Sequence, residues 1–204
     1  MLLKLYDNNT NPKDLKRISQ CLQSGGVIIY PTDTVYAIGC DINSRSAIER
    51  VANIKRVKAD KANFSFVFYD LSQISEYTKQ FDSATFKLLK RNLPGAFTFI
   101  LEANNSIPKL FKNKKRTLGI RVPDNSICRS IVENFGNPII STSVHDDDEV
   151  LEYTTDPELI YEKYKDKVDI VIDGGFGNNE ASTVVDLTAG YPEIIRQGVG
   201  ALDD

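Results

Sequence analysis

The chain has 204 residues, of which 41% are hydrophobic, and this is enough to bury one sizeable core. The net charge of −3 argues against a protein that coats nucleic acid nonspecifically, because such binding depends on an excess of Lys and Arg. No apolar segment approaches the roughly 20 residues that a membrane span requires. We therefore expect a cytoplasmic protein without a membrane partner, built as a single domain over residues 1–204.

The N-terminal region predicts a helix followed by a buried strand. Asn11 is a suitable N-cap and Pro12 suits the first helical position, so a helix should begin there and end at Gly25. The apolar run Val27–Tyr30 then predicts a short interior strand. Pro31 has no N–H with which to continue a central ladder, so the polar residues after it should lie at the end of this strand.

The rest of the chain repeats this alternation of helices and strands. Helical spacing after a capping residue predicts further helices that begin at Asn43 or Ser44, Asp70 or Ser72, Asp82, Asn125 and Asp156. Apolar runs predict strands at Phe64–Phe68, Phe97–Leu101, Leu118–Val122, Pro138–Ser143, Val168–Ile172, Thr183–Leu187 and Ile194–Arg196. Because crossover units are mixed with consecutive strands, we expect an α/β fold, a twisted open mixed sheet with helices packed on it.

Hydroxyl side chains gather at three of the predicted strand ends. The groups are Thr32 and Thr34, then Ser141, Thr142 and Ser143, and finally Ser182 and Thr183. Hydroxyls donate directed hydrogen bonds to phosphate oxygens, and the isolated Arg121 and Arg196 can neutralise phosphate charge. The combination suits a nucleotide, although each hydroxyl group taken alone is typical of a side chain that satisfies nearby backbone.

Several standard catalytic motifs are missing. The chain has neither the glycine-rich phosphate loop nor the Gly-x-Gly-x-x-Gly dinucleotide motif. The single histidine, His145, follows Ser143 by two residues without a nucleophile elbow, which disfavours a Ser-His-acid triad. His145 and the carboxylates Asp146 to Glu149 are donors for a metal ion, but consecutive like charges are typical of a solvated loop, so we predict no metal site in the protein.

Taken together, seven short motifs in order along the chain resemble the YrdC-like family, whose best-known members are threonylcarbamoyl-AMP synthases. The motifs are Tyr30–Tyr36 with Gly39, Ile54–Arg56, Pro94-Gly95 with Thr98-Phe99, Gly119–Pro123, Ser141–Ser143, Ser182–Asp186 and Arg196–Gly200. The resemblance spans nearly the whole chain. It is closest to the YciO-like branch, because Ala37, Val57 and His145 stand where synthases carry other residues.

This resemblance implies a concave, positively charged face that binds ATP and L-threonine. Members of the family convert L-threonine, bicarbonate and ATP to threonylcarbamoyl adenylate and pyrophosphate, and a partner protein then transfers the threonylcarbamoyl group to tRNA. Because phosphoryl transfer needs a counter-charge on the leaving group, we expect Mg²⁺ to accompany the ATP. The resemblance implies catalytic roles for Lys55, Arg56 and Lys58. It implies substrate binding by Thr32, Thr34, Tyr36, Thr142, Ser182 and Thr183, and nucleotide binding by Arg121, Ser141, Ser143, His145 and Arg196.

Two further functions stay open at this point. One is hydrolysis of threonylcarbamoyl adenylate, and the other is a module that binds double-stranded RNA or tRNA through its backbone. The basic segment Lys109–Arg116 favours the RNA-binding module, whereas the acidic net charge weighs against it. The hydroxyl groups favour an enzyme, because electrostatic adhesion to RNA does not need directed hydrogen bonds.

Overall fold

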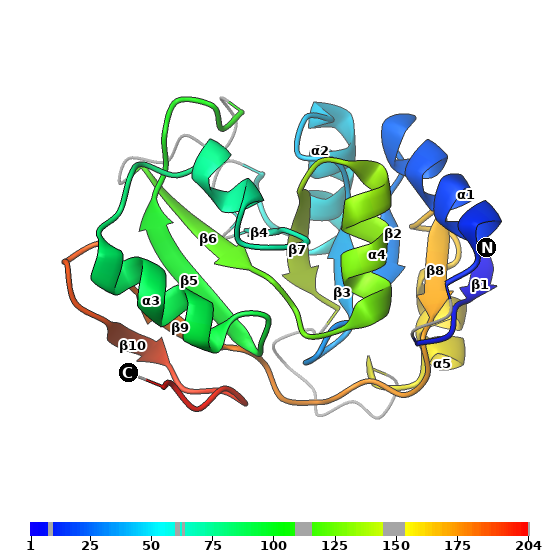
Figure 1. Ribbon diagram of the computed structural model, residues 1–204. Coiled ribbons are helices and arrows are strands. Elements are labelled where there is room, and N and C mark those ends of the chain that lie inside the picture. The colour runs from blue at the N-terminus through cyan, green and yellow to red at the C-terminus, as the bar shows by residue number, and fades with distance from the viewer. Residues whose placement is uncertain (8–9, 60–61, 63, 109–115, 145–153, 204) are drawn as a thin grey trace.

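The computed structural model describes residues 1–7, 10–59, 62, 64–108, 116–144 and 154–203. Its strands are β1 (Leu2–Lys4), β2 (Ile28–Tyr30), β3 (Ala37–Gly39), β4 (Ser65–Val67), β5 (Phe97–Glu102), β6 (Thr117–Arg121), β7 (Ile139–Ser143), β8 (Ile170–Asp173), β9 (Thr183–Asp186) and β10 (Glu193–Arg196). They form a ten-stranded sheet in the order β1-β8-β2-β3-β7-β4-β6-β5-β9-β10 (Figure 1). Parallel and antiparallel pairs alternate irregularly along it, which confirms the predicted open mixed sheet.

The helices begin at the residues that the sequence predicts. They are α1 (Pro12–Gln23), α2 (Arg45–Ile54), α3 (Ser83–Asn92), α4 (Ser126–Phe135) and α5 (Pro157–Tyr164). The side chains of their N-caps, Asn11, Ser44, Asp82, Asn125 and Asp156, each accept a backbone N–H from the first turn. None of these helices is long and apolar enough to cross a membrane.

The helix expected after Asp70 is shorter and tighter than predicted. It is a 3-10 helix over Gln73–Glu76. The Asp70 carboxylate accepts the Ser72 N–H at 2.9 Å, so its bond forms a turn ahead of the helix instead of capping an α-helix.

Two strands were missing from the prediction. β1 lies at one edge of the sheet, where it pairs in parallel with β8. β3 follows the polar residues after Pro31 and returns antiparallel to β2, so that residues 31–36 form the turn of a hairpin. Each missed strand has three residues, which is too short for an apolar alternation to be visible in the sequence.

Helices cover the two faces of the sheet unequally. Side chains from α2, α3 and α5 pack into a large cluster on one face, and this cluster runs across most of the strands. On the other face α1 and α4 lie side by side over β2, β3, β7 and β8 (Figure 1). The described members of this second cluster include no residue from β5, β6 or β9, so among the described residues no apolar cluster covers that part of the face.

Candidate functional site

A line of hydroxyl groups runs from the buried Ser141 on β7 into the part of the sheet that α1 and α4 leave uncovered. We call Ser141, Ser65, Thr98 and Ser182 the hydroxyl row, since they lie on β7, on β4, on β5 and just before β9. Ser65 pairs with Ser141 across the β4–β7 ladder, and its hydroxyl donates to the Ser141 carbonyl at 3.3 Å. The hydroxyls of Thr98 and Ser182 are 2.9 Å apart.

Gly119 on β6 joins the two halves of the hydroxyl row. A Cβ atom added to Gly119 would lie 3.3 Å from Thr98 Cγ2 and 3.5 Å from Ser65 Cβ, so these two side chains flank the glycine on one face. Ser65, Thr98 and Gly119 are all partly exposed. The glycine therefore leaves a low strip between hydroxyls, where a ligand can approach the backbone closely.

Strand alternation separates the three hydroxyls at the end of β7. Ser141 and Ser143 point to the face of the hydroxyl row, because successive side chains on a strand point to opposite faces. Thr142 pairs with Ile38 and faces the large cluster on the other side. A substrate that touches Ser141 and Ser143 therefore cannot touch Thr142 from the same face.

Arg121 is buried in a cluster of polar groups beside the hydroxyl row. It stands two residues after Gly119, so its side chain leaves β6 on the same face. Its Nη2 donates to Asp33 Oδ1 at 3.0 Å and to Thr34 Oγ1 at 2.9 Å. Thr32 and Thr34 share a contact of 3.1 Å between their hydroxyls. We call Thr32, Asp33, Thr34 and Arg121 the turn cluster.

The charge of Arg121 is balanced inside the protein. The side chains of Arg121 and Asp33 are 7% and 9% exposed, and the second Asp33 oxygen accepts the Asp124 N–H at 2.9 Å. Asp33 thus connects the hairpin turn both to β6, through Arg121, and to the residue just before the N-cap of α4. Arg121 holds the turn cluster in place, and its contact with a nucleotide stays a prediction.

Tyr36 and Thr183 also use their hydroxyls within the protein. Tyr36 Oη donates to the Gly175 carbonyl at 2.6 Å and accepts the Gly174 N–H at 3.1 Å. Burial raises the pKa of Tyr36 to about 12, so it is a neutral phenol near neutral pH. The Thr183 hydroxyl donates to the Gly200 carbonyl at 2.7 Å and is fully buried. Both side chains shape the site, and their contact with a substrate stays a prediction.

Arg196 supplies an exposed positive charge at the far end of the hydroxyl row. Its Nη2 donates to the Ser182 carbonyl at 2.8 Å. Arg196 and Thr98 both pair with Val184, from the two strands that flank β9, which places them on one face. Arg196 is therefore placed to balance the charge of a ligand bound to Ser182 and Thr98.

The other predicted cations follow α2. Lys55 is the C-cap of this helix and is half-buried, and Arg56 has a positive φ of 54°. Lys58 is exposed on the segment that leads into Ser65. The approach of these three cations to a ligand stays a prediction. His145 and all but the last residue of the basic segment Lys109–Arg116 lie outside the described residues.

Ser65 and Thr98 belong to the hydroxyl row but were not among the predicted site residues. Each is a single hydroxyl within an apolar strand, where it reads as an ordinary surface position. Thr98 had one signal, since it falls in a motif of the family resemblance. Ser65 can be recognised as a site residue because it pairs with Ser141 and Gly119 on the neighbouring strands. The local sequence does not contain this information on strand pairing.

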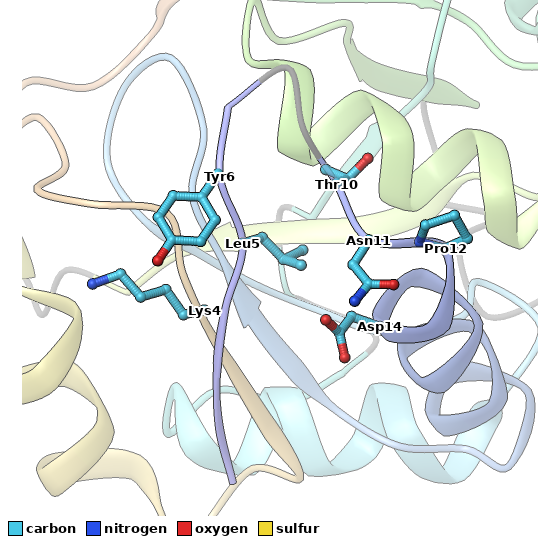
Figure 2. A pocket seen from close by; sticks show the side chains of 7 residues that line it. All are labelled: Lys4, Leu5, Tyr6, Thr10, Asn11, Pro12 and Asp14. Atoms are coloured by element: carbon cyan, nitrogen blue, oxygen red, sulfur yellow. The ribbon is translucent and has the colours of Figure 1, made fainter.

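A separate hollow of about 410 Å³ lies at the N-terminal end of α1 (Figure 2). Its walls come from the end of β1 and the first turn of α1, and include Lys4, Tyr6 and Asp14. None of the predicted site residues lines it. The hollow is therefore distinct from the hydroxyl row.

The fold and this face define an open mixed-sheet α/β protein with hydroxyls and an arginine on an uncovered sheet surface. The family model Sua5/YciO/YrdC, described as telomere recombination, matches residues 20–198. The chain belongs to this family. The YciO protein of Escherichia coli is 37% identical over 198 residues, which cover 96% of this chain and 94% of that protein.

Solved structures agree with this assignment. The crystal structure of E. coli YciO superposes with a TM-score of 0.90 at 36% identity, over 98% of this chain and 97% of that chain. Pyrococcus abyssi Sua5, crystallised with L-threonine, shares the fold with a TM-score of 0.87 at 23% identity, over 97% of this chain and 57% of that chain. A threonylcarbamoyl-AMP synthase of Coxiella burnetii is 28% identical over 178 residues, 87% of this chain and 93% of that protein.

Proposed function

We propose that this protein binds Mg–ATP, L-threonine and bicarbonate and forms threonylcarbamoyl adenylate and pyrophosphate. The observation that carries the proposal is the hydroxyl row, with Arg196 at one end and the turn cluster beside it. Directed donors and a cation on one face suit a polyphosphate. The name of the C. burnetii relative supports the same product, and the threonine bound to P. abyssi Sua5 supports the same amino-acid substrate.

The reaction requires two anions to meet. The threonine amine and bicarbonate give a carbamate with loss of water, and a carbamate oxygen then attacks the α-phosphorus of ATP. A P–O bond to the carbamate forms, the bond to the β-phosphate oxygen breaks, and pyrophosphate leaves with the electron pair. No protein nucleophile is needed, so positioning and charge stabilisation carry the catalysis.

The residues divide between these tasks. Thr98, Ser182 and Arg196 would bind the phosphates, while Thr34 would contact the amino acid at the turn cluster. Arg121 is already paired with Asp33, so extra positive charge against the carbamate would come from Lys55. The described residues contain no group of three His, Cys, Asp or Glu side chains that could hold a metal ion. Mg²⁺ would therefore arrive on the ATP phosphates.

The direct test is to incubate the protein with ATP, threonine, bicarbonate and Mg²⁺ and to measure pyrophosphate and the adenylate. We expect both products in equal amounts, and neither when threonine is omitted. Pyrophosphate released without threonine would mean simple ATP hydrolysis and would count against the proposal.

Thr98→Val tests the role of the hydroxyl row. The change keeps the shape of the side chain and removes one hydroxyl from a strand position that suits Val. We expect a rise in the KM for ATP of about 10-fold, because a hydrogen bond to a charged group is worth about 1.5 kcal/mol or more. Thr188→Val, at an exposed turn after β9, is the matched control and should leave KM unchanged.

Two other outcomes would favour the functions left open by the sequence. If no adenylate forms but added threonylcarbamoyl adenylate disappears, the protein is a hydrolase. If neither reaction occurs and double-stranded RNA or tRNA binds with a steep salt dependence, the protein is a binding module. Transfer to tRNA would need a partner protein that accepts the adenylate, and adding tRNA with cell extract to an active preparation would reveal it.

A further inference from the structure

Phe176 is more exposed than any other large apolar side chain of the described residues. It is 81% exposed and lies in the segment Gly174–Ser182 that links β8 to β9. In Figure 1 this segment (orange) runs along the lower side of the sheet. Single exposed apolar residues are common on proteins, so exposure alone assigns no role to Phe176.

The backbone on both sides of Phe176 is held firmly against the β2–β3 hairpin. Tyr36 Oη bonds to both Gly174 and Gly175, as described above. On the other side, the Gly177 N–H donates to the Thr155 carbonyl at 2.8 Å, and the Asn178 N–H donates to the Thr34 carbonyl at 3.1 Å. The exposed ring is therefore carried by a fixed loop that touches the turn cluster.

Close packing of the neighbouring glycines confirms how tightly this loop sits. A Cβ atom on Gly174 would lie 2.6 Å from Pro31 Cγ, and one on Gly177 would lie 2.7 Å from Tyr36 Cδ2. Gly175 has a φ of +90°, which side chains rarely adopt. The glycines let the loop press onto the hairpin, and the Phe176 side chain projects away from it.

We propose that Phe176 is the platform on which the adenine ring of bound ATP stacks. The inference rests on the proposed function, which places the phosphates on the hydroxyl row. The loop that carries Phe176 contacts Thr34 at one side of that row and runs on into Ser182 at its other end. In this arrangement the base of a nucleotide whose phosphates bind Ser182 and Thr98 would extend along the sheet to this ring. An aromatic face stabilises a purine by stacking and needs no further hydrogen bonds.

The first test is calorimetric titration of Phe176→Ala with Mg–ATP and with Mg–pyrophosphate. We expect the Kd for ATP to rise about 5- to 150-fold, the range that stacking of one base on an aromatic side chain provides. The Kd for pyrophosphate and the unfolding temperature should stay unchanged, because pyrophosphate has no base and the ring is exposed. Phe86→Ala, on α3 and 48% exposed, is the matched control and should bind ATP like the wild type.

A second test uses the absence of tryptophan from the chain. Phe176→Trp creates a single tryptophan at the platform, and Phe86→Trp creates one elsewhere. We expect Mg–ATP to quench the first and not the second, and Mg–pyrophosphate to quench neither. Unaltered ATP affinity in Phe176→Ala, or unchanged Phe176→Trp fluorescence while calorimetry records ATP binding, would overturn the inference. If the wild type binds no ATP in calorimetry, the proposed function fails first and takes this inference with it.

Discussion

Replacing Asp33 by Asn should strongly destabilise the protein, because it breaks a buried ion pair from one side. Asp33 and Arg121 are each less than a tenth exposed, and the Asp33 carboxylate accepts from both Arg121 and the Asp124 N–H. An amide of the same shape has one oxygen, so it must turn its NH₂ group towards one of these two donors. The change therefore leaves Arg121 buried without its counter-charge and removes one of these two hydrogen bonds.

The expected loss is about 3–5 kcal/mol, the usual cost of removing one partner of a buried ion pair. For a chain of this size each kcal/mol lowers the unfolding temperature by about 2–4 °C, so the midpoint should fall by about 6–20 °C. Urea unfolding followed by circular dichroism measures the free energy, and Glu49→Gln is the matched control. Glu49 pairs with Arg45 at 2.9 Å, but their side chains are 49% and 79% exposed. That pair should contribute less than about 0.5 kcal/mol. If Asp33→Asn costs no more than Glu49→Gln, the turn cluster does not hold the hairpin in place.

Three further predictions concern activity, pH and thiol chemistry. Lys55→Ala should abolish adenylate formation in the pyrophosphate assay. Lys16 is exposed on α1, and Lys16→Ala is the control that should keep the activity. Full turnover by Lys55→Ala would show that Lys55 is not part of the site. Burial raises the pKa of Tyr36 from 10 to about 12. The neutral phenol therefore contributes fully to the free energy of unfolding below pH 10, and this contribution is lost as the pH rises to 12. Urea unfolding across that range should show a decline that is about 3 kcal/mol smaller in Tyr36→Phe than in the wild type, and an equal decline in both would refute it. Burial also raises the pKa of Cys21 to about 11 and that of Cys128 to about 12. Near pH 8 iodoacetamide should therefore label the partly exposed Cys21 slowly, and it should label the buried Cys128 after the protein is unfolded. Rapid labelling of Cys128 in the folded protein would contradict its burial.

The helices could be predicted from the sequence because their signals are local. An N-cap such as Asn125 accepts a hydrogen bond from the N–H three residues later, so the signal lies within a few residues of sequence. β3 could not be recognised in the same way. It is held in place by β2 on one side and by β7, about a hundred residues later, on the other. Short strands of this kind are defined by their partners and not by their own composition.

The candidate site shows the same limit. The end groups of the hydroxyl row, Ser141 and Ser182, were predicted because hydroxyls cluster at strand ends in the sequence. Ser65 and Thr98, which lie between them, were not predicted, because only the pairing of neighbouring strands brings their hydroxyls next to Ser141 and Ser182. The alternation of side chains on β7 was available from the sequence alone, and it would have separated Thr142 from its neighbours.

The most direct test of this account is a crystal structure of the protein with Mg–ATP bound. We expect phosphate oxygens within hydrogen-bond distance of the Thr98 and Ser182 hydroxyls, with the Arg196 guanidinium beside them. A nucleotide bound on another surface, with these hydroxyls still bonded to each other, would contradict the claim that the uncovered face of the sheet is the site of chemistry.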